Sequence, residues 1–322
     1  MDLVRARLSD GSIAHLTDTD DRNESWPYWS PAAGRLVYQS AGRRDGGHAT
    51  PTDLMLWRPG GEPRPLLSTP ARNESWPVWS PDGRRVVHVF RGPGSAAGIA
   101  SIDVATGQST LVARVVPPRF LLRPNFAPDG VRIVAEQRRD SGGTALRVLT
   151  PGEPPSVLTD EPNLSDSKAW FSRDGATIVF TRSAGSNSLA SSDVFSIPST
   201  GGSARPLFAD PDLAEHSARP SPTRDEVVYI AGPDGHTDVF IANLDGSRSR
   251  PLVRTADVNE FTPRWSPDGE FFTVIAVPAG RGPGRLDDPD SLARIQLRAY
   301  DREGNLRFDT RGMMADWMPA WP

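Results

Sequence analysis

Short apolar runs alternate with turn-forming residues along the whole chain. Runs such as RLVYQS (35–40), RRVVHVF (84–90) and TIVFTR (177–182) are rich in β-branched and aromatic side chains and are bounded by Pro, Gly, Asp or Ser. Such runs are typical of β-strands. No stretch has apolar residues at the i, i+3, i+4, i+7 spacing for long enough to form a substantial helix. The pattern therefore predicts an all-β protein.

The sequence also repeats itself. The segment RNESWPYWSP at 22–31 returns as RNESWPVWSP at 72–81, and weaker copies follow at intervals of 45 to 56 residues. The aromatic residue before Ser-Pro, or its counterpart, anchors each copy. The anchors are Trp29, Trp79, Phe126, Phe171, Pro220, Trp265 and Trp321. Each copy predicts four strands, A to D, with A ending at the anchor and Pro-Asp-Gly turning into B. Units of this size are typical of β-propeller blades.

The two ends of the chain share one blade in this count. Residues 3–8 and 13–17 have the pattern of a C–D pair, and residues 316–321 supply a seventh A strand. A closing blade formed from both termini leaves no free sheet edge. We therefore expect one monomeric β-propeller domain, 1–322, with seven blades favoured and six possible. The closing blade lacks a B strand, which indicates either a native chain that extends upstream of Met1 or a blade complete with three strands.

Composition narrows the class of protein. The 322 residues include 32 Pro and 29 Gly, a density of helix breakers that favours short strands. A formal charge of −4 gives no basic stripe for nucleic acid, and no run approaches the ~20 apolar residues of a membrane span. The absence of cysteine excludes disulfides, thiolate nucleophiles and Cys-ligated zinc. The start, MDLVRARLSDG, has no signal-peptide region, so the cellular location is left unknown.

One repeat motif carries a family resemblance. The pattern P-x-W-S-P-D-G followed by a β run, as in WPVWSPDGRRVVHVF and TPRWSPDGEFFTVIAV, resembles the WD-like repeats of the TolB β-propeller family across essentially the whole chain. The resemblance implies a propeller, a non-enzymatic binding role and a periplasmic or extracellular location. The same repeat serves peptidase lids and some lyases. TolB-like proteins also carry an N-terminal α/β domain and look six-bladed, which this sequence does not match.

Candidate binding residues precede the anchors. In a propeller, strand A lies innermost, so these residues gather at one mouth of the channel. Six of seven copies have an acid five residues before the anchor, whereas the third has Leu121. Three residues before the anchor, the first two copies have Trp and the next two have Arg or Lys. In the fifth copy the acid Glu215 is followed directly by His216. The expected contact set is Glu24, Trp26, Glu74, Trp76, Arg123, Asp166, Lys168, Glu215, His216, Glu260 and Asp316.

Each of these residues also has a structural interpretation. The acids would then bond backbone N–H groups of the neighbouring D–A loop and staple blade to blade. Trp26 and Trp76 would pack between blades rather than form an exposed stacking platform. Converging carboxylates could also bind Ca²⁺ at the channel mouth, although we expect no resident metal or cofactor. The long B–C loops at 41–52, 91–98, 183–191 and 279–293 lie on the same face, where recognition is common.

No catalytic residue is predicted. The chain has no G-x-S-x-G nucleophile elbow, and its five histidines show no H-x-x-x-H spacing for a metal. Ser165 and Lys168 match S-x-x-K, but they precede a strand rather than open a helix. We therefore expect a non-enzymatic protein that presents a funnel of loops to a protein or peptide partner. The alternative is an enzyme, either a propeller-fold polysaccharide lyase or the propeller lid of a separated serine peptidase.

Overall fold

The computed structural model describes residues 2–42, 51–94, 96–115, 119–185, 191–233, 235–279 and 294–311. Their regular secondary structure consists of β-strands, and no helix among them is long and apolar enough to cross a membrane. The chain forms two compact units. Among the described residues, the first comprises those within 2–140 and 148–156, and the second comprises those within 141–147 and 157–311. The expectation of one domain over 1–322 stays a prediction.

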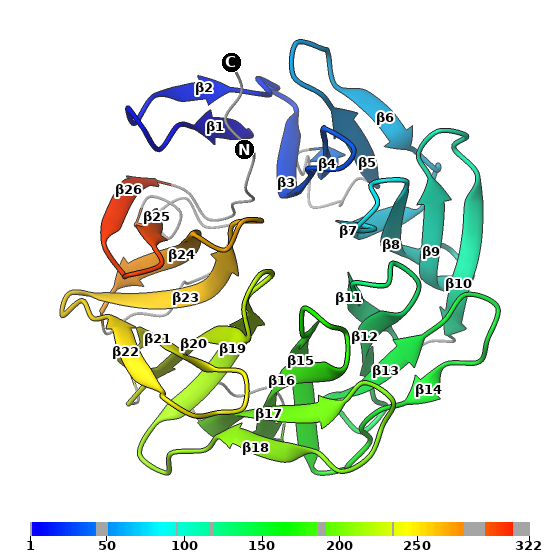
Figure 1. Cartoon of the computed structure of the whole chain (residues 1–322). Coiled ribbons are helices and arrows are strands. Elements are labelled where there is room, and N and C mark those ends of the chain that lie inside the picture. Colours follow the sequence, from blue (N-terminus) through cyan, green and yellow to red (C-terminus); the bar gives the residue numbers. More distant parts are fainter. Residues whose placement is uncertain are drawn as a thin grey trace. The chain divides into compact units, whose positions relative to one another are not determined.

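Antiparallel sheets make up the first part of the chain (Figure 1). A two-stranded sheet pairs β1 (Val4–Ala6) with β2 (Ile13–His15). Three four-stranded sheets follow, each with its strands in chain order. They are β3 (Arg22–Ser30), β4 (Arg35–Gly42), β5 (Thr52–Trp57) and β6 (Arg64–Leu67); β7 (Asn73–Trp79), β8 (Arg85–Arg91), β9 (Ala97–Asp103) and β10 (Ser109–Val115); and β11 (Leu121–Phe126), β12 (Ile133–Arg138), β13 (Thr144–Leu149) and β14 (Ser156–Val157).

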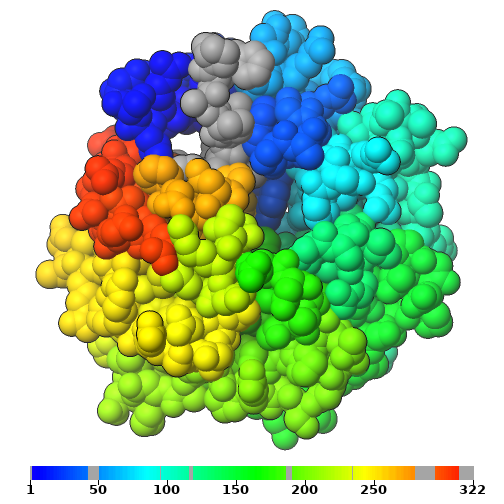
Figure 2. Space-filling model, viewed as in Figure 1, coloured from blue at the N-terminus to red at the C-terminus, as the bar shows by residue number. Residues whose placement is uncertain are grey.

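The second unit continues the same plan. Its sheets lie against one another, with β19 packed on β15, β16 and β17, and β23 packed on β19, β20 and β21 (Figure 2). Its strands are β15 (Leu164–Phe171), β16 (Thr177–Ala184), β17 (Ser192–Pro198) and β18 (Arg205–Phe208); β19 (Ala214–Pro220), β20 (Glu226–Gly232), β21 (Asp238–Asn243) and β22 (Arg250–Val253); and β23 (Val258–Trp265), β24 (Phe271–Pro278), β25 (Gln296–Asp301) and β26 (Leu306–Arg311).

These sheets are the predicted blades. Each of the six four-stranded sheets has the order A, B, C, D, so the all-β propeller prediction is confirmed. The sheet β1–β2 is the predicted N-terminal C–D pair. The A strand expected at 316–321 lies outside the described residues. The seventh blade, closed by both termini, therefore stays a prediction.

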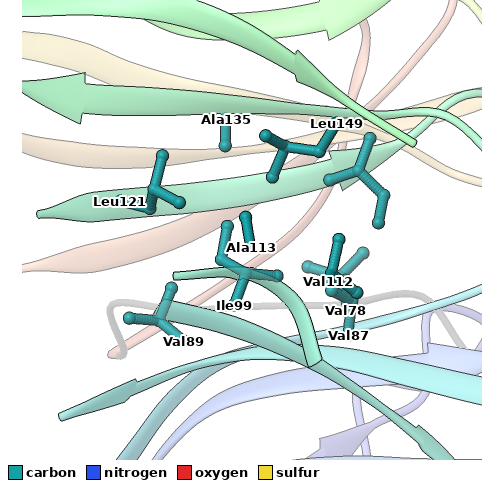
Figure 3. Close-up of a cluster of buried hydrophobic side chains, with 10 residues drawn as sticks. Val78, Val87, Val89, Ile99, Val112, Ala113, Leu121, Ala135 and Leu149 are labelled. Carbon is teal, nitrogen blue, oxygen red and sulfur yellow. The ribbon is translucent and has the colours of Figure 1, made fainter. Parts of the chain in front are cut away.

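Apolar faces hold neighbouring sheets together. In the first unit, Val87 and Val89 of β8 and Ile99 of β9 pack in one cluster with Leu121 and Leu149 of the next sheet (Figure 3). These five side chains are at most 2% exposed. Burying one such side chain stabilises the fold by roughly 1.5–3 kcal/mol. The cluster fixes β7 beside β11, which places their preceding loops on a rigid scaffold.

The W-S-P-D-G motif has a structural explanation. Trp79 donates its indole N–H to the carbonyl of Tyr28 at 2.9 Å, which ties one first strand to the first strand of the preceding repeat. Ser80 Oγ donates to Asp82 Oδ1 at 2.6 Å and Gly83 takes a φ of 68°, which closes the turn into β8. Trp265 makes the same bond to a strand of its own unit, at 3.0 Å. The recurring anchor therefore has a structural role, because it holds neighbouring first strands together.

Candidate functional site

A β-bulge interrupts the first strand of every four-stranded sheet. In β3, residues 26 and 27 oppose the single residue Tyr38 of β4, and the register shifts there. The other five first strands shift at the equivalent point. The first bulge residue has a φ of 45° to 58° although it is never glycine. These residues are Trp26, Trp76, Arg123, Lys168, Ser217 and Thr262.

The bulge puts side chains in strained positions. A left-handed conformation costs a non-glycine residue roughly 1–2 kcal/mol. Bulges re-aim side chains and are common beside functional sites. Four of the six side chains that the bulges re-aim are members of the contact set predicted from the sequence. The structure thus gives a common geometric origin to Trp26, Trp76, Arg123 and Lys168.

The predicted acids of the first unit are buried. Glu24 is 2% exposed and accepts hydrogen bonds from the hydroxyls of Thr19 (3.0 Å) and Ser40 (3.3 Å). Glu74 is fully buried, and its carboxylate lies 2.8 Å from His88 Nδ1 and 3.2 Å from Arg72 Nε. Both acids therefore bind neighbouring side chains rather than presenting free carboxylates to solvent.

The acids of the second unit follow the same rule. Asp166 is fully buried and pairs with Arg182 at 2.7 Å. Glu215 accepts the backbone N–H of Asp210 at 3.2 Å, and Glu260 accepts the hydroxyl of Thr255.

Burial shifts the ionisation of two of these acids. Removal from water raises the pKa of Glu215 to about 7, and it does the same for Glu260. The nearby carboxylates of Asp193 and Asp238 act in the same direction. The proposed role of the acids as partner contacts stays a prediction.

The residue before the acid binds the preceding sheet. Asn73 Oδ1 accepts the N–H of Thr52 at 3.2 Å, and Asn259 Oδ1 accepts the N–H of Thr237 at 3.1 Å. Ser165 Oγ plays this part for Thr144 at 3.0 Å. The acid side chains also bond to the loop that joins one sheet to the next, as Glu215 does to the backbone N–H of Asp210, and the interpretation that they staple blade to blade stays a prediction.

Two tryptophans meet in the first unit. The rings of Trp26 and Trp76 lie edge to face, with centroids 6.3 Å apart and planes at 71°. Both side chains are half-buried, and Trp76 also packs against the apolar cluster of β7–β13. The backbone N–H of Trp76 donates a hydrogen bond to Gln39 Oε1 at 2.9 Å. The pair thus combines the two sequence interpretations, since it packs between repeats and still leaves part of its surface exposed.

A hydrogen-bonded chain of three side chains occupies the second unit. Lys168 Nζ donates to Ser217 Oγ at 2.7 Å, and Ser217 Oγ lies 3.0 Å from His216 Nδ1. Burial and the positive charge of Lys168 hold the pKa of His216 well below its usual range. In the neutral ring with its proton on Nε2, Nδ1 accepts a hydrogen bond from the Ser217 hydroxyl. The ring also stacks on Phe261, with centroids 6.5 Å apart.

Other predicted residues are placed as follows. Arg123 is exposed and binds buried Glu136 at 2.7 Å. Asp316 and most of the predicted loops at 41–52, 183–191 and 279–293 lie outside the described residues. Within the described ranges, no group of three or more His, Cys, Asp or Glu side chains is arranged to hold a metal ion, and calcium binding stays a prediction.

Sequence reasoning missed the bulge and the partners of the acids. Proline inside a strand marks a sheet edge or a bulge, because it cannot donate to the ladder. Pro27 and Pro77 directly follow the left-handed tryptophans and carried this signal. His88 and Arg182 lie on the second strands of their sheets. Predicting that they pair with Glu74 and Asp166 requires the register between first and second strands, and the bulge shifts that register.

Comparisons with known proteins agree with the repeat. The model of the family described as "TolB beta propeller domain" matches residues 59–314. No curated protein matches the chain by sequence.

Solved structures share the fold. A structure from a study of two prolyl endopeptidases superposes with a TM-score of 0.65 at 15% identity, covering 90% of this chain and 42% of that one. An oligogalacturonate lyase in complex with manganese gives 0.64 at 14% identity, covering 97% and 83%. A putative TolB from Agrobacterium tumefaciens gives 0.56 at 17% identity, covering 78% and 86%. The chain therefore spans less than half of the prolyl endopeptidase. At these identities the likeness shows the fold alone.

Proposed function

Because the chain belongs to the TolB beta propeller domain family, we propose that it is a non-enzymatic protein that captures a protein or peptide partner beside its first strands. The observation that supports this most is the contact between Trp26 and Trp76. Both rings are turned by strained bulges and both stay partly exposed. Strain at a repeated position is maintained only where the surrounding structure over-determines it.

The chemistry around the pair suits a peptide. Tryptophan and arginine are the residues most enriched among interface hot spots. Arg123 occupies the bulge of β11, which packs against β7, and its guanidinium is anchored by buried Glu136. The pair thus offers an apolar edge, and the exposed, anchored guanidinium offers N–H donors beside it. A peptide with an aromatic or proline side chain near a carboxylate matches both features.

The test is selection of binding peptides. Random peptides displayed on phage are panned against the protein, and synthetic copies of the enriched sequences are titrated by fluorescence anisotropy. The variant Trp26→Gly/Trp76→Gly should lose this binding, because glycine accepts the positive φ while the rings are removed. Trp26→Phe/Trp76→Phe should retain most of it.

The control separates binding from folding. Val131→Ala removes exposed apolar surface from the same unit and should leave affinity unchanged. Thermal unfolding of each variant is measured alongside. Equal peptide affinity in the wild type and in a folded double glycine variant would refute the proposal.

One observation in the second unit favours a second candidate, a polyuronate lyase. Lys168 is the chain's single lysine, it is half-buried, and its ammonium group meets the hydroxyl of Ser217 beside neutral His216. A cation that neutralises a uronate carboxylate together with a neutral base is what β-elimination needs. Oligogalacturonate and related acidic polysaccharides would be incubated with the protein while ultraviolet absorbance of unsaturated product is followed. A trace that stays flat for all of them excludes this candidate.

A further inference from the structure

A pocket in the first unit has no assigned role. It lies between the segment 15–19, which leaves β2, and the sheet β3–β6, and its volume is about 620 Å³. Small-molecule sites typically measure roughly 300–1,000 Å³. Its polar lining includes Asp18, Arg22, Glu24, Tyr38, Asp53 and Glu62.

The charge of the pocket is negative. Arg22 Nη2 pairs with Asp53 at 2.8 Å, which neutralises one of the four lining carboxylates. Asp18, Glu24 and Glu62 have no ion-pair partner in the described part of the chain. Asp18 and Glu62 are exposed, whereas Glu24 is 2% exposed and bonded to neutral hydroxyls. A buried carboxylate without a counter-ion costs free energy that a bound cation would recover.

Tyr38 is a second, independent sign of a ligand. This side chain lines the pocket and is 2% exposed, yet its hydroxyl makes no hydrogen bond within the described residues. The hydroxyl is therefore free to bond to a molecule in the pocket. Burial raises the pKa of Tyr38 to about 12. The negative charge of Glu24 also raises this pKa, whereas the positive charge of Arg22 lowers it. The protonated phenol therefore stands beside Glu24 with its hydrogen-bonding capacity unused.

The remaining lining is apolar. Leu16, Met55, Pro63 and Pro65 contribute to the pocket. An aliphatic stem would contact these side chains while its charged end reaches the carboxylates. From the three uncompensated carboxylates, the unused tyrosine hydroxyl and this apolar lining, we infer that the pocket binds an organic cation, a primary ammonium or guanidinium group on an aliphatic stem. The cation comes from a free amine or from a Lys or Arg side chain of a peptide.

The experiment is calorimetric titration of the whole protein. Cadaverine and spermidine represent free amines, and tri-lysine blocked at both ends represents the peptide source. Glutarate, an anion of similar length to cadaverine, is the negative probe. At least one cationic probe should bind, more weakly as salt rises. Preference for the free amines or for the blocked peptide identifies the source, and either preference supports the inference.

Variants link any binding to the pocket. Glu24→Gln should weaken binding roughly tenfold or more, because it removes the buried charge. Tyr38→Phe keeps the packed ring and should weaken it several-fold. Glu62→Gln tests the exposed carboxylate without touching the core. Glu153→Gln, an exposed acid of the same unit outside the pocket, should leave affinity unchanged.

Two results would overturn the inference. One is no heat of binding with any cationic probe at millimolar concentration in low salt. The other is equal affinity in the wild type and in folded Glu24→Gln, Tyr38→Phe and Glu62→Gln, which would show diffuse attraction to an acidic surface. The inference does not depend on the Trp26–Trp76 proposal, whose variants retain this pocket.

Discussion

The bulges of β7 and β19 have the same backbone and opposite chemistry. In β7 the strained residue is Trp76, whose ring meets a second tryptophan. In β19 it is Ser217, which links Lys168 to His216. The repeat fixes the position and the strain, whereas the side chain at that position is free to vary. Specialisation in this protein therefore lies at the bulge and not at the recurring W-S-P anchor.

The acid before each bulge shows the same contrast in its partners. Glu74 lies between two basic side chains, Arg72 and His88, whereas Glu215 and Glu260 accept neutral donors. In β11 the residue equivalent to Glu74 is Leu121, and the residue opposite the bulge, equivalent to His88, is Ala135. Both side chains at this place are apolar. One fold position thus holds an acid paired with basic side chains, an acid bonded to neutral donors or an aliphatic side chain.

The largest expected effect comes from breaking the Glu74–His88 pair. Glu74→Leu should lower the free energy of unfolding by about 3 kcal/mol, because it leaves the buried His88 imidazole and the half-buried Arg72 without their carboxylate partner. Glu74→Leu/His88→Ala reproduces the apolar pair of β11 and should recover more than about 1 kcal/mol of this loss. Urea unfolding of both singles and the double measures the coupling. Strictly additive losses would show that the carboxylate and the imidazole do not interact.

A pH-dependent effect follows from Glu260. Its pKa is near 4.5 in the unfolded chain and about 7 when folded. Between these values the unfolded chain loses its proton first, so stability falls as pH rises through this window and levels off above it. Glu260→Gln cannot ionise, so its advantage over the wild type should grow from about pH 5 to about pH 7, by at most about 1.4 kcal/mol per pH unit. Unfolding curves across this range test it. Glu153→Gln is the exposed control, and parallel profiles for Glu260→Gln and the wild type would contradict the prediction.

Strain at the bulge gives a smaller effect. Thr262 has a φ of 47° and is β-branched. Thr262→Gly should raise the free energy of unfolding by about 0.5–1 kcal/mol, because relief of left-handed strain exceeds the entropy that glycine adds to the unfolded chain. Thr262→Ala retains the Cβ and should gain less. The comparison is made by thermal unfolding, and an alanine variant more stable than the glycine variant would show that the bulge carries no such strain.

The sequence predicted the strands, the turns and the repeat because these depend on neighbouring residues. Alternating apolar runs and the Ser-Pro-Asp-Gly turn are local signals, and all six complete sheets follow them. The recurring acid was also visible, but its burial was not. Partners such as His88 and Arg182 lie on the adjacent strand, where the bulge shifts the register by one residue. Contacts between repeats, such as Trp26 with Trp76, depend on how sheets pack and have no local signature.

The smallest effect tests the polar chain of the second unit. The charge of Lys168 helps to hold down the pKa of His216, after burial as the main cause. Lys168→Met should therefore raise the pKa of His216 while burial keeps it below the usual value, whereas Lys168→Arg keeps the charge. Nuclear magnetic resonance titration of the imidazole signals measures this shift. Because Lys168 is the only lysine, isotope-labelled lysine gives a single side-chain signal that reports its environment directly. An unchanged His216 titration in Lys168→Met would show that the ammonium charge does not reach the ring. The bulge of β19 would then be no more specialised than its counterpart at Thr262.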